Sequence, residues 1–246
     1  MGGSISSISS LEWRNMATSE AHRAPRLYSY IVRVDDGAAP NPYNGMCTLA
    51  ICKPAIRRTA REGDWILGTG SAAAGLDGRM IYAMRVDEAI TLEEYDRRAP
   101  LEWKHRIPDM SSRSRARRRG DCIYDYSAPP WPRQRQGVHG PGNRDVDLGG
   151  KNVLIGREYT YFGEDAVELP RGLRSLVHRT QGHKWKLNAP LLDRFVSWVE
   201  GQPRGMLGKP GFAQRENSKT GARGCDLRCS DDHDGQLCIR QDDERS

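Results

Sequence analysis

The sequence predicts an α+β domain with a small, curved, mixed or antiparallel sheet, or a partly closed β-barrel, edged by helices. Two observations predict this class. Most strand-like segments lie in the first half of the chain, and the helical segments are short and interrupt them irregularly. This order differs from the strand–helix alternation of a doubly wound sheet. The chain also has neither a GxGxxG motif nor a P-loop lysine.

Both ends of the chain are polar. Residues 1–25 are rich in Ser without periodicity, and residues 205–246 are rich in Gly, Arg, Asp and Gln. Only 37% of the 246 residues are apolar. Such ends bury too little surface to offset the entropy of ordering. We therefore expect disordered tails over 1–25 and 205–246, flanking one domain over 26–204.

The elements of the first half follow from local composition. Aromatic and β-branched runs predict strands, Pro54 ends one of them, and Gly63 ends a short helix. The predicted strands span 27–34, 46–52, 64–70 and 78–90, and the helix spans 55–63. We expect the four strands to share one curved sheet.

The second half is less regular. Thr91 with Glu94 three residues later forms a capping box that begins a helix over 91–98. An irregular, Pro- and Arg-rich stretch follows over 99–150, then a strand or hairpin over 151–163 and a short helix over 169–176. The segment 189–203 has apolar residues on one helical face, so we expect its helix to pack outside the sheet.

No apolar run reaches the ~20 residues of a membrane helix, and the start lacks the features of a signal peptide. These features predict a cytoplasmic protein, and Met16 is a possible initiator. The six cysteines are too sparse for a disulfide framework. Cys225, Cys229, His233 and Cys238 approach the spacing of a zinc knuckle, with the second Cys one residue late. Zinc binding or a plain polar tail both fit this stretch.

The candidates for catalysis are scattered. Cys47 and Cys52 fit small buried hydrophobes, or a nucleophile that would need a partnered His. Acid–base candidates are Asp64, Asp121, His139 and His183, with no spacing that fixes their geometry. No HxH, HxD or HExxH pattern is present, so we expect no metal centre and no cofactor.

Four stretches combine turn backbone with aromatic and hydrogen-bonding groups: NPYNG, GDWILGTGS, GDCIY and YTYFG. If they converge, they would form a pocket for one flat polar ring. The glycines around Thr69 fit either an ordinary turn or an anion-binding concavity, and Trp65 fits either the core or a stacking wall. The candidate ligand-binding residues are Asn41, Tyr43, Asp64, Trp65, Thr69, Gly70, Ser71, Asp121, Tyr124 and Tyr161.

The formal net charge of +6 is locally concentrated, because residues 113–119 hold five arginines and no acid. Such a run is either a solvated loop or a contact for phosphates. The candidate phosphate contacts are Lys53, Arg57, Arg58, Arg117, Arg118 and Arg119.

Several uncommon strings occur together and in order: YSYIVRVDDGAAPNPYNGMCTLAICKPAIRRTAREGDWILGTGS, GRMIYAMRVDEAITLEEY, GDCIYDY and YTYFG. Over most of residues 26–200 the chain resembles the nucleotide modification associated domain 2 family of bacteria and phages. Its helix, Gly-Asp turn and strands are also similar to PUA-like folds such as the EVE and ASCH domains. The family tends toward Gly-Asp-Asn where this chain has Gly120-Asp121-Cys122.

The resemblance implies a link to systems that make or handle modified nucleobases. We expect a protein that recognises a modified nucleobase, free or within DNA or RNA, in a modification or defence system. A second hypothesis is an enzyme acting on a modified nucleotide through Asp64 and Asp121 with His183 or Cys47. A third is a non-catalytic interaction subunit of a modification complex. The expected partners are a modified nucleotide or nucleic acid and other subunits of such a system, without a membrane.

Overall fold

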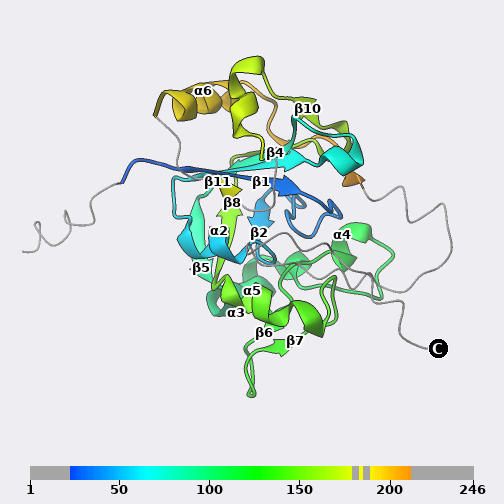
Figure 1. Ribbon diagram of the computed structural model, residues 1–246. Helices are drawn as coiled ribbons and strands as arrows, with labels where there is room; N and C mark the ends of the chain where they lie inside the picture. Colours follow the sequence, from blue (N-terminus) through cyan, green and yellow to red (C-terminus); the bar gives the residue numbers. More distant parts are fainter. Residues whose placement is uncertain (1–22, 179–182, 185–188, 212–246) are drawn as a thin grey trace, which may run out of the picture.

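The computed structural model describes residues 23–178, 183–184 and 189–211, and it confirms the α+β class. The largest sheet has the strand order β11-β1-β3-β4-β9-β12, with β10 paired to β4 (Figure 1). These strands are β1 (Leu27–Val32), β3 (Trp65–Gly70), β4 (Arg79–Arg85), β9 (Tyr159–Tyr161), β10 (Val167–Glu168), β11 (His183–Lys184) and β12 (Gly205–Met206). We call this the large sheet.

A second sheet corrects the expectation that four strands share one sheet. β2 (Cys47–Leu49) pairs antiparallel with β8 (Asn152–Gly156), which pairs with β5 (Glu88–Thr91). β6 (Tyr124–Asp125) and β7 (Arg133–Gln134) form a separate ribbon. Within the described residues the sheets are open, and no closed barrel forms.

Two predicted segments divide where the chain passes between the sheets. The expected strand over 78–90 splits into β4 and β5, because Val86 ends the pairing with β3 and the chain turns at Asp87. The expected hairpin over 151–163 is wrong for the same reason, since β8 joins the second sheet and β9 the large one.

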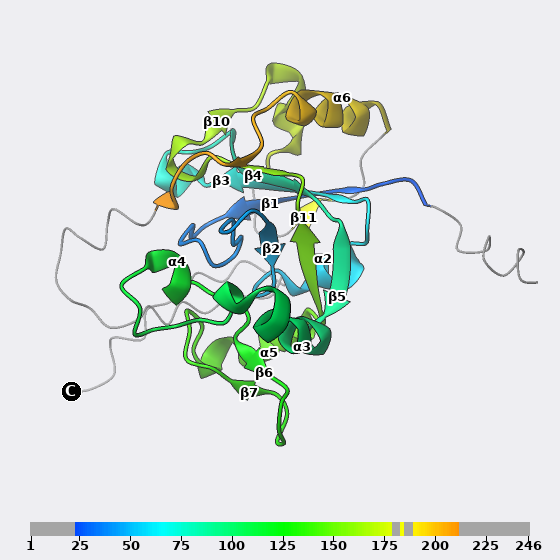
Figure 2. The same cartoon turned by 180° about the vertical axis from the view of Figure 1, so that it is seen from behind.

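Helices cover both sides of these sheets (Figures 1 and 2). α6 (Ala189–Glu200) and the 3-10 segment η5 (Arg171–Leu176) lie on the outer face of the large sheet, as expected for the segment 189–203. α2 (Pro54–Thr59), α3 (Leu92–Glu102), α4 (Arg115–Arg118) and α5 (Arg144–Gly149) lie on the other side. Thr91 caps α3 by accepting the Glu94 N–H at 3.0 Å, as the capping box predicted.

The stretch 99–150, expected to be irregular, contains α4, α5 and the β6–β7 ribbon. Short 3-10 segments, η2 (Lys104–Arg106) and η3 (Pro141–Asn143), join its helices, and η1 (Ala72–Ala74) and η4 (Gly163–Asp165) lie next to the large sheet. No described helix is long and apolar enough to cross a membrane.

The chain remains ordered past the expected domain end at 204. β12 pairs parallel with β9, the Leu207 N–H donates to the Tyr161 carbonyl at 2.8 Å, and the Glu164 N–H donates to Lys209. At the other end, the Arg23 guanidinium binds Asp64. The described residues after 204 therefore pack against β9 and η4. Most of the two predicted tails, with Met16 and the Cys225–Cys238 group, lies outside the described residues.

We expect a chain that lacks residues 205–246 to melt several °C below one that lacks only 212–246, because the shorter chain loses the β9–β12 pairing. Differential scanning calorimetry of both chains measures the difference. Equal melting temperatures would show that the segment contributes no stability and would restore the domain end at 204.

Asp35 predicts a pH dependence of stability. It is 4% exposed, accepts hydrogen bonds from the Tyr161 hydroxyl and the Gly211 N–H, and burial raises its pKa from 3.8 to about 6. A raised folded-state pKa stabilises the fold fully below pH 3.8 and loses that contribution as the pH rises through about 6. Relative to Asp35→Asn, the unfolding free energy should fall by roughly 3 kcal/mol across this window. Urea titrations of both proteins at several pH values test this, and parallel pH profiles would contradict it.

Candidate functional site

Cys52 lies on a sharp turn between a buried strand and a short helix. It follows β2 by three residues and directly precedes Lys53 and α2. Cys52 has φ +58° and Lys53 has φ +43°, in the left-handed region that non-glycine residues rarely adopt. Such strain costs about 1–3 kcal/mol per residue and tends to occur at functional sites. Nucleophiles of hydrolases occupy a comparable strained strand-to-helix turn.

A histidine and a carboxylate complete a chain of contacts from this thiol. Cys52 Sγ lies 3.4 Å from His139 Nε2, and His139 Nδ1 lies 2.6 Å from Asp147 Oδ2. The three residues come from the β2–α2 turn, the loop before η3, and α5. This order of nucleophile, base and orienting carboxylate is the one that thiol catalysis requires.

Asp147 is fully buried and joins the parts of the site. Its Oδ1 accepts the Cys52 N–H at 2.8 Å, and its Oδ2 also accepts the Tyr124 hydroxyl at 3.0 Å. The buried Arg57 guanidinium donates to the carbonyls of Asp147, Cys52 and Asn152 at 2.7–3.0 Å. The cysteine turn and the aspartate helix are thus held together by one charged side chain.

The same three residues are the only described group of His, Cys, Asp and Glu that could hold a metal ion. In the observed geometry Asp147 binds His139 Nδ1, which is where a second-layer carboxylate orients a metal-bound histidine. An ion between Cys52 and His139 Nε2 would then have two protein ligands, whereas catalytic zinc sites have three. The arrangement favours a nucleophile over a metal centre.

Cys47 and Cys122 contrast with Cys52. Both are buried, and burial raises the pKa of each thiol well above its usual range. Cys47 is 0% exposed within the core cluster, which favours the interpretation as a buried hydrophobe. Of the described cysteines, Cys52 is the one less deeply buried.

Three of the four predicted ligand stretches converge, but around a charged side chain of the interior. Arg106 is 1% exposed and donates to the carbonyls of Asn41, Tyr43 and Met46. It also donates to Thr48, which in turn donates to Asp121. From YTYFG, the Tyr159 hydroxyl donates to Pro42 at 2.9 Å.

The predicted base-reading groups in this network have partners within the protein. Asn41 donates its amide to the Arg119 carbonyl, and Asp121 accepts the Tyr95 hydroxyl as well as Thr48. Burial raises the pKa of Asp121. The Tyr161 hydroxyl binds Asp35, and the Tyr43 N–H donates to Asn41 at 3.3 Å. In this conformation these hydrogen bonds hold the loop over residues 35–46 in place.

The fourth stretch, GDWILGTGS, lies on β3 and its turn, apart from this network. Asp64 accepts the N–H groups of Arg61 and Arg26 and caps the turn. A Cβ at Gly68 would lie 2.3 Å from the Tyr82 ring, so the bare backbone accommodates an aromatic side chain. Thr69 donates to the Tyr30 carbonyl, and Ser71 caps η1. A Cβ at Gly70 would likewise meet Leu76 at 2.3 Å. These contacts correspond to the ordinary-turn interpretation.

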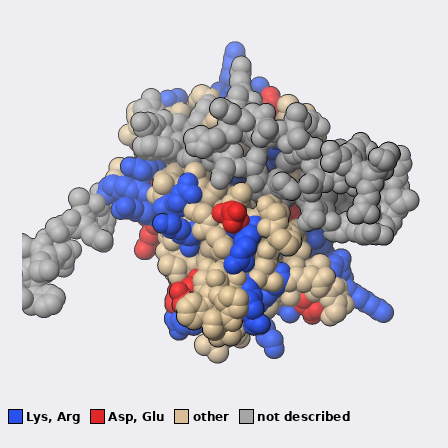
Figure 3. Space-filling model, turned by 60° about the horizontal axis from the view of Figure 1, so that its bottom comes forward, with Lys and Arg blue, Asp and Glu red and all other residues tan. Residues whose placement is uncertain are grey.

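The predicted phosphate contacts also bind within the protein. Arg57 is fully buried, and Arg58 donates to the Gly149 carbonyl. Lys53 Nζ lies 4.9 Å from the centroid of the Tyr30 ring. The half-buried guanidinium groups of Arg117, Arg118 and Arg119 donate to the carbonyls of Lys104, Ser112 and Asp36. Figure 3 shows Lys and Arg side chains in several separate groups over the described part of the underside.

The sequence indicated Cys52 and His139 separately and did not single out Asp147. The sequence placed Cys52 within the predicted strand 46–52, whereas β2 ends at Leu49 and Cys52 lies in the following turn. Nothing local pairs it with His139, which lies 87 residues further along the chain. The other histidine among the acid–base candidates, His183, lies on β11, where its backbone pairs with Tyr30 of β1.

The family model described as nucleotide modification associated domain 2 matches residues 24–218, which is most of the chain. No curated protein and no solved structure matches the chain.

We expect Cys52 to be alkylated by iodoacetamide before Cys47 and Cys122, because a histidine nitrogen lies 3.4 Å from its sulfur while burial protects the other two. His139→Gln should slow the reaction at Cys52 about tenfold or more near neutral pH. Peptide mass mapping over time follows each cysteine separately. An unchanged rate in the variant would mean that the imidazole does not activate the thiol.

Proposed function

The chain belongs to the nucleotide modification associated domain 2 family, and from that premise we propose that it is a thiol-dependent enzyme acting on a modified nucleotide or nucleobase. The observation that supports this most directly is the chain of contacts from Cys52 Sγ through His139 to Asp147. Recognition of a modified nucleobase, free or within nucleic acid, is the binding step of the same proposal.

The chemistry that fits these groups is transfer of an acyl group. His139 Nε2 takes the proton of the Cys52 thiol, and the thiolate attacks the carbonyl carbon of an amide or ester on the nucleotide. A C–S bond forms, the C–N or C–O bond breaks, and the leaving amine or alcohol takes the proton from His139. Water or an amine then attacks the thioester, so that the acyl group leaves and the thiol is restored. Asp147 holds the imidazole in the required orientation.

The position of Cys52 supports nucleophilic chemistry over a purely structural role. Two consecutive residues at positive φ are held by the buried Asp147 and Arg57, which bind the Cys52 N–H and carbonyl. Residues in such strained conformations are concentrated at active sites, and this turn places a half-buried cysteine beside a histidine. The fold therefore stabilises a strained conformation at the residue that faces the histidine.

Incubation with acylated nucleosides tests the proposal. With N4-acetylcytidine and ribose-acylated nucleotides as probes, we expect an acyl adduct on Cys52 in the intact mass, removable by hydroxylamine as a thioester is. Cys52→Ala should abolish the adduct, and His139→Gln should slow its formation by about 10²-fold. Cys122→Ser, another cysteine close to buried charges, is the matched control and should retain it.

Two other outcomes would support the other hypotheses. Retention of modified nucleosides without any mass change, unaffected by Cys52→Ala, would indicate a protein that only recognises the base. If the protein neither retains nor converts these nucleosides, the result would favour a non-catalytic subunit that acts through protein partners.

A further inference from the structure

The spacing of Cys52 and His139 fits a metal ion as well as it fits a shared proton. Cys52 Sγ lies 3.4 Å from His139 Nε2. A tetrahedral Zn²⁺ bound to one thiolate and one imidazole nitrogen holds these two ligand atoms roughly 3.5 Å apart. We propose that this pair binds a thiophilic (sulfur-binding) divalent cation such as Zn²⁺, which reversibly blocks the thiol. The inhibitory role rests on the proposed function, whereas binding of the cation does not.

The hydrogen bonds of His139 orient its ring for this role. Asp147 is fully buried, and its Oδ2 lies 2.6 Å from His139 Nδ1. An ionised carboxylate only accepts hydrogen bonds, so Nδ1 of the neutral imidazole carries the hydrogen and Nε2 keeps its lone pair on the side of Cys52. A carboxylate behind a metal-bound histidine has this same arrangement. The Gln134 amide holds the loop by donating to the carbonyls of His139 and Gly140 at 2.8 and 3.0 Å.

The backbone of Cys52 is held equally firmly, and its sulfur is within reach of solvent. The Cys52 N–H donates to Asp147, and the Cys52 carbonyl accepts from Arg57. The side chains of Cys52 and His139 are both half-buried rather than enclosed, so a hydrated cation reaches them. A site whose ligands are already positioned loses little entropy when the ion binds.

The number of ligands predicts an ion that exchanges. Both oxygens of Asp147 already accept hydrogen bonds, from the Cys52 N–H, His139 and the Tyr124 hydroxyl. Asp147 therefore stays behind the histidine, and water completes the coordination of an ion that has two protein ligands. Catalytic zinc sites have three protein ligands and keep their metal. Occupancy of the Cys52 site should instead follow the concentration of the free cation.

The chemistry of the two ligands selects the cation. Thiolate and imidazole suit Zn²⁺ and similar ions, whereas Mg²⁺ prefers carboxylate, carbonyl and water oxygens. When Zn²⁺ binds, the thiol releases its proton to solvent, one metal–sulfur and one metal–nitrogen bond form, and no electron is transferred. The metal then occupies the Nε2 lone pair that would take the thiol proton, as well as the sulfur that would attack the substrate. A bound cation and thiol catalysis thus exclude each other.

Protection of Cys52 from alkylation tests the site in the full chain, first freed of metal with EDTA. We expect a small excess of Zn²⁺ to slow the reaction of Cys52 with iodoacetamide by about tenfold or more, because the metal-bound sulfur is a poorer nucleophile. Added EDTA should restore the rate, and Mg²⁺ should leave it unchanged. Peptide mass mapping reads Cys52 separately from the other cysteines. The same rate with and without Zn²⁺ would overturn the proposal, and this comparison needs no variant.

His139→Gln tests whether the imidazole is the second ligand. Each protein is compared with itself in the presence and absence of Zn²⁺, because the variant reacts more slowly even without metal. The protection at Cys52 should disappear in His139→Gln. His105→Gln changes a histidine outside this group and is the matched control, which should keep the protection. Protection that survives His139→Gln would show that the thiol binds zinc alone and would refute the two-ligand site.

A Cd²⁺ titration detects the metal–sulfur bond directly through the ultraviolet absorption of cadmium thiolates. Cys52→Ala should remove the share of one thiolate from this absorption. The double variant Cys225→Ser, Cys229→Ser controls for the tail and should keep that share. Absorption that is the same in Cys52→Ala and in the unchanged protein would contradict metal binding at Cys52.

The metal measurements contain no nucleotide, so their failure leaves the test with acylated nucleosides untouched. If the acyl adduct forms on Cys52, Zn²⁺ should suppress it and EDTA should restore it. Acylation at an undiminished rate in the presence of Zn²⁺ would refute the inhibitory role. Absence of any adduct would refute the proposed function and the inhibitory role together, while protection from alkylation would still establish the metal site.

Discussion

The burial of one carboxylate, Asp147, is the constraint on which the lower half of the molecule depends. A fully buried carboxylate is tolerated only when its oxygens accept hydrogen bonds and a counter-charge lies near. Here the partners are the Cys52 N–H, the His139 ring and the Tyr124 hydroxyl, while Arg57 binds the Asp147 backbone. Those partners come from the β2–α2 turn, the loop before η3, and β6. The hydrogen bonds that Asp147 accepts thus bring the Cys52 turn and the His139 imidazole together.

A second buried charge, on Arg106, brings predicted ligand-binding residues together in the interior of the protein. Arg106 draws the 41–46 loop, Thr48 and Asp121 inward, because its two terminal nitrogens donate to carbonyls of the loop and to the Thr48 hydroxyl. Because a buried guanidinium must be hydrogen-bonded, polar residues that could have bound a ligand instead form a structural network. The two networks are alike in composition, and they differ in that the first includes the half-buried Cys52.

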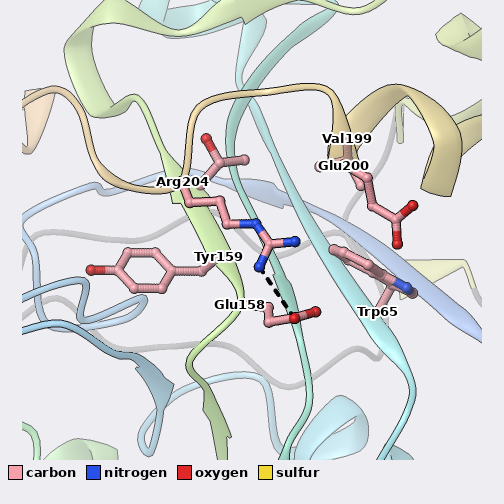
Figure 4. A pocket seen from close by; sticks show the side chains of 7 residues that line it. Trp65, Glu158, Tyr159, Val199, Glu200 and Arg204 are labelled. Atoms are coloured by element: carbon pink, nitrogen blue, oxygen red, sulfur yellow. Dashed lines mark hydrogen bonds and ion pairs between the residues drawn. The ribbon is translucent and has the colours of Figure 1, made fainter.

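The large sheet separates the Cys52 site from the core cluster under α6. The Cys52 site lies with α2 and α5 on one side. On the other side Trp65 packs against Phe195 of α6 and lies beside Val199 near the end of that helix (Figure 4). The groups at Cys52 are held by hydrogen bonds to the buried Asp147 and Arg57.

The sequence by itself determined the α+β class, the capped helix α3, the outer helix α6 and the family, because these depend on local patterns or on strings of residues. It also identified Trp65 as a candidate for ligand binding and His139 as a candidate for acid–base catalysis. Only the tertiary structure decided that β2 lies outside the large sheet, that residues 205–206 pair with β9, and that Cys52 rather than Cys47 faces a histidine. Cys47 and Cys52 occupy similar apolar surroundings in the sequence. The difference between them arises from side chains about 90 residues away, and hydrogen bonds over such separations leave no local pattern.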